Sequence, residues 1–306
     1  MATILGGIFT SHVPGIGVAM ARGLQQDAYW KPFFDGFDPV HAWLDRARST
    51  TAVVFYNDHG LNFFLDKLPT FAVGAAPVYH NADEGWGLIP TRPFAGAPEL
   101  SWHIIESLVA DEFDVTTCQD MLVDHALALP CALAWPDVAT WPVRIVPIAI
   151  NTVQHPLPSP KRCLALGRAV HRALASWEGD DRIVVMGTGG LSHQLDGARA
   201  GHINTAYDRF CMDALAATPD ALVAHSSLDI VELAGSQGVE ILNWIAARGA
   251  LGPRAHERSR TYHLPISNTA AAVMLLEADH ADDPVGHATA RPRYDDRRHA
   301  ASLPAA

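Results

Sequence analysis

The 306-residue chain has few cysteines, few lysines and no long hydrophobic run. Its four cysteines are far apart and form no CxxC pair, which argues against a disulfide framework and against a zinc site made of thiolates. We expect all four to be reduced core residues: Cys118, Cys131, Cys163 and Cys211. No apolar run approaches the roughly 20 residues of a membrane helix. The start, MATILGGIFTSH, lacks the basic region and cleavage site of a signal peptide, so we expect a cytoplasmic protein.

Positive charge is also scarce. Lys and Arg total 22 against 33 for Asp and Glu, which gives a formal net charge of −11 at pH 7. A surface of that sign repels phosphate backbones, so nucleic acid is not expected as a partner. Hydrophobic residues nevertheless make up 49% of the chain, which excludes a disordered or collagen-like protein. Histidine is the abundant residue type, with 16 copies against three of lysine.

Short apolar runs rich in β-branched residues alternate with stretches of helical length and spacing. The predicted strands are residues 4–10, 51–56, 71–75, 143–150 and 182–186, and the predicted helices are residues 100–110, 161–177, 204–217 and 238–247. Because these strands are apolar on both faces, they are typical of a sheet that is covered on both sides. The pattern predicts an α/β fold, a sandwich of helices around a mostly parallel or mixed central β-sheet.

The character of the chain changes near its C-terminal end. Residues 279–306 are polar, contain proline and show no periodicity, so we interpret them as a disordered tail. Residues 1–278 are predicted to form a single domain.

Three of the predicted strands lead directly into a histidine. Residues 4–10 are followed by His12, residues 51–56 by His59, and residues 182–186 by the segment GTGGLSH, which ends at His193. Because ligands bind at the carboxyl ends of such strands, the three imidazoles are candidates for one shared site. Alternatively, each is a polar residue at a strand end that bonds to nearby backbone. The GTGG segment lacks the spacing of a GxGxxG or Walker phosphate loop.

A carboxylate that could join these histidines is Glu240, which lies in the apolar segment GVEILNWIAARGAL. Removing a carboxylate from water is costly unless it is paired or bound to a cation. It could instead lie on an exposed stripe or pair with an arginine. Two histidines and one carboxylate form the facial triad of non-haem Fe(II) oxygenases, which leaves coordination positions open for substrate and dioxygen.

With these residues in place, the sequence resembles the class III extradiol ring-cleaving dioxygenases, and within them the catalytic β subunits of protocatechuate 4,5-dioxygenase. The likeness covers nearly all of residues 1–278. It is carried by TSHVPGIG around His12, VFYNDH ending at His59, NADEGWG from Asn81, VDHA around His125, GTGGLSHQL around His193, GVEILNWIAARGAL around Glu240 and YHLPISNTA from Tyr262. Beside His125 the chain departs from the family, with Ala126 in place of glycine and Leu122 in place of an acidic residue.

The resemblance implies a role for each matching residue. His12, His59 and Glu240 match the iron ligands, His193 matches the catalytic acid/base, and His125 matches a second active-site histidine. Ser267 and Asn268 match the region that faces the substrate's carboxylate. Asn57, beside the ligand loop, is also expected to contact the substrate.

The resemblance also implies a reaction. Residues 1–278 would be an extradiol dioxygenase catalytic domain that uses Fe(II) and O2 to open a carboxylated catechol. The first expectation is protocatechuate 4,5-cleavage to a 4-carboxy-2-hydroxymuconate semialdehyde, with gallate or 3-O-methylgallate as the alternative substrate. A small α subunit or a homo-oligomer is expected to close the site.

These residues are also compatible with other classes of function. Two histidines and a carboxylate suit a zinc-type metal hydrolase, and the fold would also suit a non-catalytic binding protein. Of the remaining histidines, those up to His263 are expected to be structural or surface residues. Asp83 and Glu84 are expected to bond local backbone amides.

Overall fold

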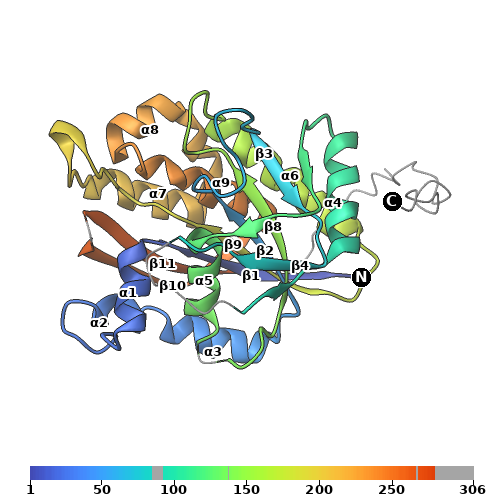
Figure 1. Ribbon diagram of the computed structural model, residues 1–306, viewed down its shortest axis with the longest axis horizontal. Helices are drawn as coiled ribbons and strands as arrows, with labels where there is room; N and C mark the ends of the chain where they lie inside the picture. The colour runs from blue at the N-terminus through green and yellow to red at the C-terminus, as the bar shows by residue number, and fades with distance from the viewer. Residues whose placement is uncertain (85–91, 137, 267, 280–306) are drawn as a thin grey trace.

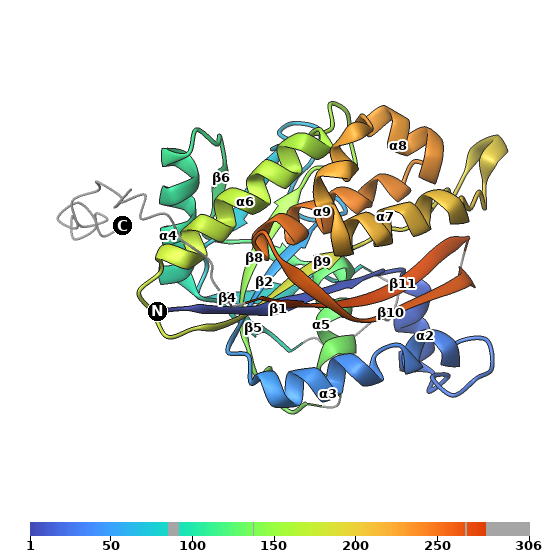
Figure 2. The ribbon, with the colours of Figure 1, turned by 180° about the vertical axis from the view of Figure 1, so that it is seen from behind.

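A mixed β-sheet runs through the middle of the molecule, with helices on both of its faces (Figures 1 and 2). The computed structural model describes residues 1–84, 92–136, 138–266 and 268–279. In these ranges the sheet has eight strands in the order β10-β11-β1-β9-β2-β8-β3-β6. Their bounds are β1 Thr3–Thr10, β2 Thr51–Tyr56, β3 Phe71–Gly74, β6 Thr116–Cys118, β8 Arg144–Ile150, β9 Arg182–Thr188, β10 Ala255–Ile266 and β11 Thr269–Ala278.

The centre of the sheet is parallel. Strands β1, β9, β2 and β8 are consecutive neighbours, and each adjacent pair is parallel. Antiparallel pairs flank them, β11 beside β1 on one side and β3 beside β8 on the other. The predicted mostly parallel or mixed sheet is therefore confirmed, and the carboxyl ends of the four central strands share one edge.

The helices form a layer on each face of the sheet. Helices α4, α6, α7, α8 and α9 cover one face, and α1, α2, α3 and α5 cover the other (Figures 1 and 2). Their bounds are α1 Pro14–Ala21, α2 Lys31–Asp35, α3 Asp38–Ala47, α4 Pro98–Ala110, α5 His125–Ala134, α6 Pro160–Ser176, α7 Thr205–Ala217, α8 Ser227–Ala234 and α9 Ile241–Ala250. Within the described ranges, no helix combines the length and apolar character that crossing a membrane requires.

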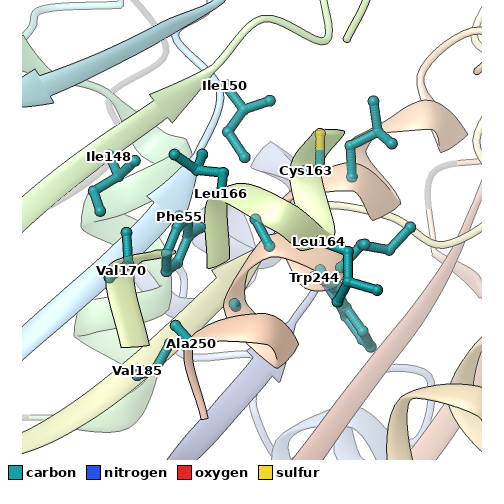
Figure 3. Packing of buried hydrophobic residues seen from close by; sticks show 14 of the residues in the cluster. Phe55, Ile148, Ile150, Cys163, Leu164, Leu166, Val170, Val185, Trp244 and Ala250 are labelled. Atoms are coloured by element: carbon teal, nitrogen blue, oxygen red, sulfur yellow. The ribbon is translucent and has the colours of Figure 1, made fainter. Parts of the chain in front are cut away.

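Side chains that alternate along the strands supply two hydrophobic cores. In β2, Val53 and Phe55 point to one core, while Val54 and Tyr56 point to the other. Figure 3 shows the first core, where Phe55 lies among residues of α6 and α9 such as Val170. All four cysteines are buried and unpaired, as expected for reduced core residues.

The predicted elements match the structure closely where patterns are regular. The helix predicted for residues 161–177 is α6, which begins at Pro160 and is capped by Ser159 Oγ accepting from the Arg162 N–H at 3.1 Å. The helix predicted for residues 238–247 is divided into a 3₁₀ turn, Gly238–Glu240, and α9. The proposed tail, except for Asp279, lies outside the described residues, so the boundary at 278 stays a prediction.

The β10–β11 hairpin was not predicted. An uninterrupted apolar run such as β11 cannot be told from a buried helix by periodicity alone, and β10 is rich in charged residues. A second small sheet, in the order β5-β4-β7, was also missed because its strands are very short. They are β4 Val78–Asn81, β5 Phe94–Ala95 and β7 Leu122–Val123.

Candidate metal and catalytic centre

Three neighbouring parallel strands end at one site. His12 follows β1, His59 follows β2 and His193 follows β9, so all three lie at the same edge of the sheet. His125, the first residue of α5, joins them. The ring centroids of His59 and His125 are 4.2 Å apart, and those of His12 and His59 are 5.3 Å apart. The structure thus brings together the histidines that the strand-end pattern singled out.

Glu240 completes this group as its carboxylate. It is only 6% exposed, which rules out the exposed-stripe alternative. Its Oε2 lies 3.3 Å from His12 Nε2 and its Oε1 lies 3.6 Å from His59 Nε2. Although burial opposes ionisation, the two histidines hold the pKa of Glu240 well below its ordinary value. The buried carboxylate is therefore ionised beside two imidazoles.

The donor set fits a divalent metal ion. His12 Nε2 is buried and has no hydrogen-bond partner within the described part of the chain, although it faces Glu240. Ring nitrogens of His12, His59 and His125 lie within 4.8 Å of one another. Two imidazole nitrogens and a carboxylate on one side of such a site suit Fe(II), and imidazole with carboxylate also suits zinc.

Asp124 orients His59, although no role is predicted for this residue from the sequence. Its Oδ2 accepts hydrogen bonds from both the backbone N–H and Nδ1 of His59, each at 2.9 Å. Its Oδ1 accepts from the Ala126 N–H at 3.0 Å and so caps α5. With Nδ1 protonated, Nε2 of His59 is left to face Glu240. Burial lowers the pKa of His59, but Asp124 and Glu240 outweigh it and raise the value to about 10.

Glu84 holds His125 in a comparable way. Its Oε1 lies 2.7 Å from His125 Nδ1, and its Oε2 accepts from the His125 N–H at 2.8 Å. The expectation that Glu84 bonds local backbone amides is therefore wrong. Strand β4 pairs with β7, placing Asn81 opposite Val123, so the segment after β4 reaches the first turn of α5.

Asn57 bridges two of the candidate ligands. It is buried, and its Nδ2 lies 3.3 Å from Glu240 Oε1 and 3.2 Å from His59 Nε2. Its Oδ1 accepts from Asn243 Nδ2 at 2.9 Å. The amide of Asn57 is therefore engaged with the candidate ligands, and its predicted contact with substrate remains a prediction.

The surroundings of His193 favour the neutral form of its imidazole. Burial lowers its pKa, and the nearby imidazoles of His12 and His59 act in the same direction against Glu240. Its Nε2 has no hydrogen-bond partner among the described residues. Gly189 packs closely against the site, since a Cβ on this residue would lie 2.7 Å from Glu240 Oε2, and its φ is +98°. The glycine at this position is therefore explained without a bound phosphate.

A cavity of about 310 Å³ lies over these residues. No Lys or Arg of the described ranges is among its lining residues. They are His12, Val13, Pro14, Asn57, His59, His125, Thr152, Val153, Gly190, His193, Leu195, Ser236, Gln237 and Glu240. At the rim, Val153 is 55% exposed and Leu195 is 54% exposed, so the cavity opens beside apolar side chains.

Asn268 and the two family departures lie outside the cavity lining. Ser267 is outside the described residues. Asn268 is exposed at the turn between β10 and β11, and it does not line the cavity. Neither Leu122 nor Ala126 lines the cavity either.

Five of the other histidines have the structural roles expected of them. Each of the five donates from its ring to a backbone carbonyl at the surface or between elements. The pairs are His41 with Leu133, His103 with Ala173, His171 with Ala250, His202 with Leu233 and His263 with Tyr29.

Comparison with known proteins shows the family of the chain. Residues 6–274 match the family described as the catalytic LigB subunit of aromatic ring-opening dioxygenase. The chain is 37% identical over 196 residues to a gallate dioxygenase of Pseudomonas putida, a match that covers 64% of this chain and 57% of that protein.

Two further comparisons extend this result. A 2,3-dihydroxyphenylpropionate/2,3-dihydroxicinnamic acid 1,2-dioxygenase of Photorhabdus laumondii is 32% identical over 186 residues, covering 61% of this chain and 55% of that protein. The matches to these two relatives span little more than half of their lengths. An uncharacterised Escherichia coli K12 protein of known crystal structure shares the fold, with a TM-score of 0.54 and 14% identity over 88% of this chain and 99% of that one.

Proposed function

The chain belongs to the family of the catalytic LigB subunit of aromatic ring-opening dioxygenases, and we propose on that premise that it cleaves a carboxylated catechol in an extradiol reaction with Fe(II) and O2. One observation carries the proposal most directly. The carboxylate of Glu240 lies between the Nε2 atoms of His12 and His59, and His12 Nε2 has no other partner in the described part of the chain.

We assign His12, His59 and Glu240 as the residues that hold the metal. Bound Fe(II) would supply the redox chemistry that allows dioxygen to react with an aromatic diol. Asp124 fixes the tautomer of His59, and Asn57 donates to Glu240, so both support the ligand arrangement.

The chain itself supplies proton transfer and orientation. His193 is neutral at pH 7 because burial lowers its pKa, so its imidazole can accept a proton from a catechol hydroxyl. His125, held by Glu84, faces the same cavity and would orient the substrate ring or bond one of its oxygens. Apolar residues such as Val13 and Val153 limit the access of water.

The substrate is proposed to be a catechol that carries a carboxylate. Both relatives compared above are named for such compounds, and the likeness to the gallate dioxygenase favours gallate beside protocatechuate. The cavity offers no lysine or arginine in the described ranges, so neutral donors would bind the carboxylate. Ser267 remains a proposed donor, whereas Asn268 is exposed and does not line the cavity. Pocket groups that hydrogen-bond a substrate discriminate strongly against analogues that cannot pair with them.

The decisive experiment is anaerobic loading with Fe(II), followed by measurement of oxygen uptake with gallate, protocatechuate, 3-O-methylgallate and unsubstituted catechol. We expect uptake of one O2 per ring opened and a yellow ring-opened product with a carboxylated substrate. Loading with Zn²⁺ is the matched control and should give no uptake. Absence of uptake with every diol after full iron loading contradicts the proposal, and hydrolytic activity with bound Zn²⁺ would favour a metal hydrolase instead.

The open rim is proposed to be closed by a second chain, either a small α subunit or another copy. The support is the exposure of Val153 and Leu195 at the mouth of the cavity. Sedimentation analysis of the wild type and of Leu195→Asp tests the homo-oligomer. A monomer in both cases leaves the separate subunit as the closing chain.

A further inference from the structure

The loop that carries His193 is held mainly through its backbone. Residues 189–193, which we call the base loop, pair with the start of β11 through Leu191 N–H to Ala270 O at 3.0 Å and Ala270 N–H to Ser192 O at 2.9 Å. The N–H of His193 donates to Ala234 O at 2.7 Å. Because Nε2 of the imidazole has no partner in the described residues, its position depends on this backbone.

A buried carboxylate of α7 accepts hydrogen bonds from the base loop. Asp208 is 1% exposed. Its Oδ1 accepts from both the N–H of Ser192 at 2.9 Å and the hydroxyl of Ser192 at 2.7 Å. Its Oδ2 accepts from the hydroxyl of Tyr262, in β10, at 2.7 Å. Asp208 therefore ties three elements together: α7, the base loop and the β10–β11 hairpin.

The same contacts continue to the start of α7. Ser192 Oγ accepts from the N–H of Asn204, and Asn204 Oδ1 caps α7 by accepting from the N–H of Tyr207. The Ser192 hydroxyl thus donates to Asp208 and accepts from Asn204. A satisfied polar network of this kind restricts its members to one arrangement.

Stability alone does not account for an aspartate at this position. All three hydrogen bonds to its carboxylate come from neutral groups, and burial raises the pKa of Asp208 above its ordinary value. Replacing buried charged groups by apolar side chains of similar volume is often neutral or stabilising for a fold. A hydrogen-bonded carboxylate, in contrast, fixes the positions of the groups that donate to it.

We propose that Asp208 is a positioning residue that sets the location of His193 through Ser192 and couples it to the β10–β11 hairpin. The assignment of a catalytic task to His193 rests on the proposed function; the fixing of the loop does not. Asp208 is not among the described residues that line the cavity, and its carboxylate bonds Ser192 and Tyr262, so its effect on the site would be transmitted through the base loop.

The test compares Asp208→Asn and Asp208→Ala with Asp181→Asn, which is a matched control. Asp181 is also a buried carboxylate with three donors, Thr51, Arg144 and Trp177, but it lies at the opposite edge of the sheet. Tyr262→Phe is a milder variant that removes only the bond to Oδ2, and it serves if Asp208→Ala does not fold.

We expect kcat per bound iron to fall about 10- to 100-fold in Asp208→Ala, because small misplacements of a catalytic group have effects of this size. The loss of kcat should be smaller in Asp208→Asn and in Tyr262→Phe, with KM and iron content unchanged. Asp181→Asn should keep the wild-type kcat, even if its melting temperature drops as much as that of the Asp208 variants. An unchanged kcat in folded Asp208→Ala, or equal losses in the Asp181 control, overturns the proposal.

Hydrogen exchange of the metal-free proteins gives a readout that does not depend on turnover. The N–H groups of Leu191, Ser192 and His193 should exchange at least tenfold faster in Asp208→Asn than in the wild type or in Asp181→Asn. Unchanged exchange there overturns the proposal. If the wild type opens no catechol, the proposed function fails, while faster local exchange still shows that Asp208 fixes the base loop.

Discussion

The two ends of strands β1, β2 and β9 are built in opposite ways. At the amino ends, Asp181 accepts from Thr51 Oγ1 at 2.5 Å, from Arg144 Nη2 at 2.7 Å and from Trp177 Nε1 at 2.8 Å. The backbone there is paired as well, with Thr3 N–H donating to Asp181 O at 2.8 Å. Both carboxylate oxygens of Asp181 therefore have partners at this edge.

At the carboxyl ends, several buried polar side-chain atoms of the described residues have no hydrogen-bond partner. Within the described part of the chain, four buried polar atoms without partners lie at or just after the ends of the parallel strands. They are the hydroxyl of Tyr56 at the end of β2, Nε2 of His12 after β1, Oγ1 of Thr152 after β8 and Nε2 of His193 after β9. Buried groups of this kind are destabilising unless something completes them.

The contrast indicates that the two ends of the same strands have different roles, one in stability and the other in the proposed function. Substitutions at the amino ends should affect the free energy of unfolding, and those at the carboxyl ends should affect metal binding and turnover. Four substitutions test this contrast, in descending order of expected effect.

Glu240→Gln should have the largest effect. Removing the anionic ligand should abolish iron retention and lower turnover by more than about 10⁴-fold, beyond the range for a single acid–base group. Gln has the same shape as Glu but lacks the charge that His12 and His59 stabilise, as the lowered pKa of Glu240 indicates, so the melting temperature of the metal-free protein should fall. Iron analysis, oxygen uptake and calorimetry measure the three quantities. Full iron content in this variant would remove Glu240 from the ligand set.

His193→Ala should separate chemistry from binding. We expect turnover to fall roughly 10²- to 10⁴-fold, the usual contribution of a general acid–base group, with iron content and substrate affinity retained. Stopped-flow oxygen consumption under saturating catechol provides the rate, and anaerobic titration provides the affinity. Normal turnover would place the base at another residue.

Asp124→Asn should weaken the metal site without destroying it. The variant removes the charge that keeps His59 Nδ1 protonated, so we expect iron affinity to fall about 10- to 100-fold. Competition with a chelator measures the affinity, and Asp181→Asn is the control that should not change it. Equal affinities in the wild type and Asp124→Asn would show that Asp124 serves only to cap α5.

Asp181→Asn should be the mildest change for activity. We expect a loss of about 1 to 3 kcal/mol in unfolding free energy, typical of disrupting buried hydrogen bonds, with turnover unchanged at temperatures where the protein is folded. Thr51, Trp177 and Arg144 lower the pKa of Asp181 despite its burial. The carboxylate therefore stabilises the fold above the unfolded pKa of about 4, and this contribution is lost as pH falls through the lower folded value.

Urea unfolding of both proteins between pH 7 and pH 3 measures that difference. The gap between wild type and Asp181→Asn should be widest at neutral pH and shrink as the solution becomes acidic. A gap that is constant with pH, or a loss of turnover at neutral pH, would break the contrast between the two edges.

The loops that carry the candidate ligands could be predicted from the sequence, but the carboxylates that orient those ligands could not. His12, His59 and His193 were recognised because each follows an apolar strand, and strand direction places them at one edge. Asp124 and Glu84 act on residues that lie in other elements, so no local spacing revealed them. For Asp124 a usable signal existed, since an aspartate directly before an apolar helical run is a typical N-cap.

The sequence by itself determined the strands β1, β2, β3, β8 and β9, the helices α4, α6 and α7, and the candidate site residues His12, His59, His193 and Glu240, because these follow from local periodicity and from residue chemistry. Only the tertiary structure decided which carboxylate serves which imidazole, and that Glu240 is buried between His12 and His59. It also decided that Asp208 lies behind the base loop. These contacts depend on how parallel strands and distant helices pack, and that packing is set by burial across the whole sheet.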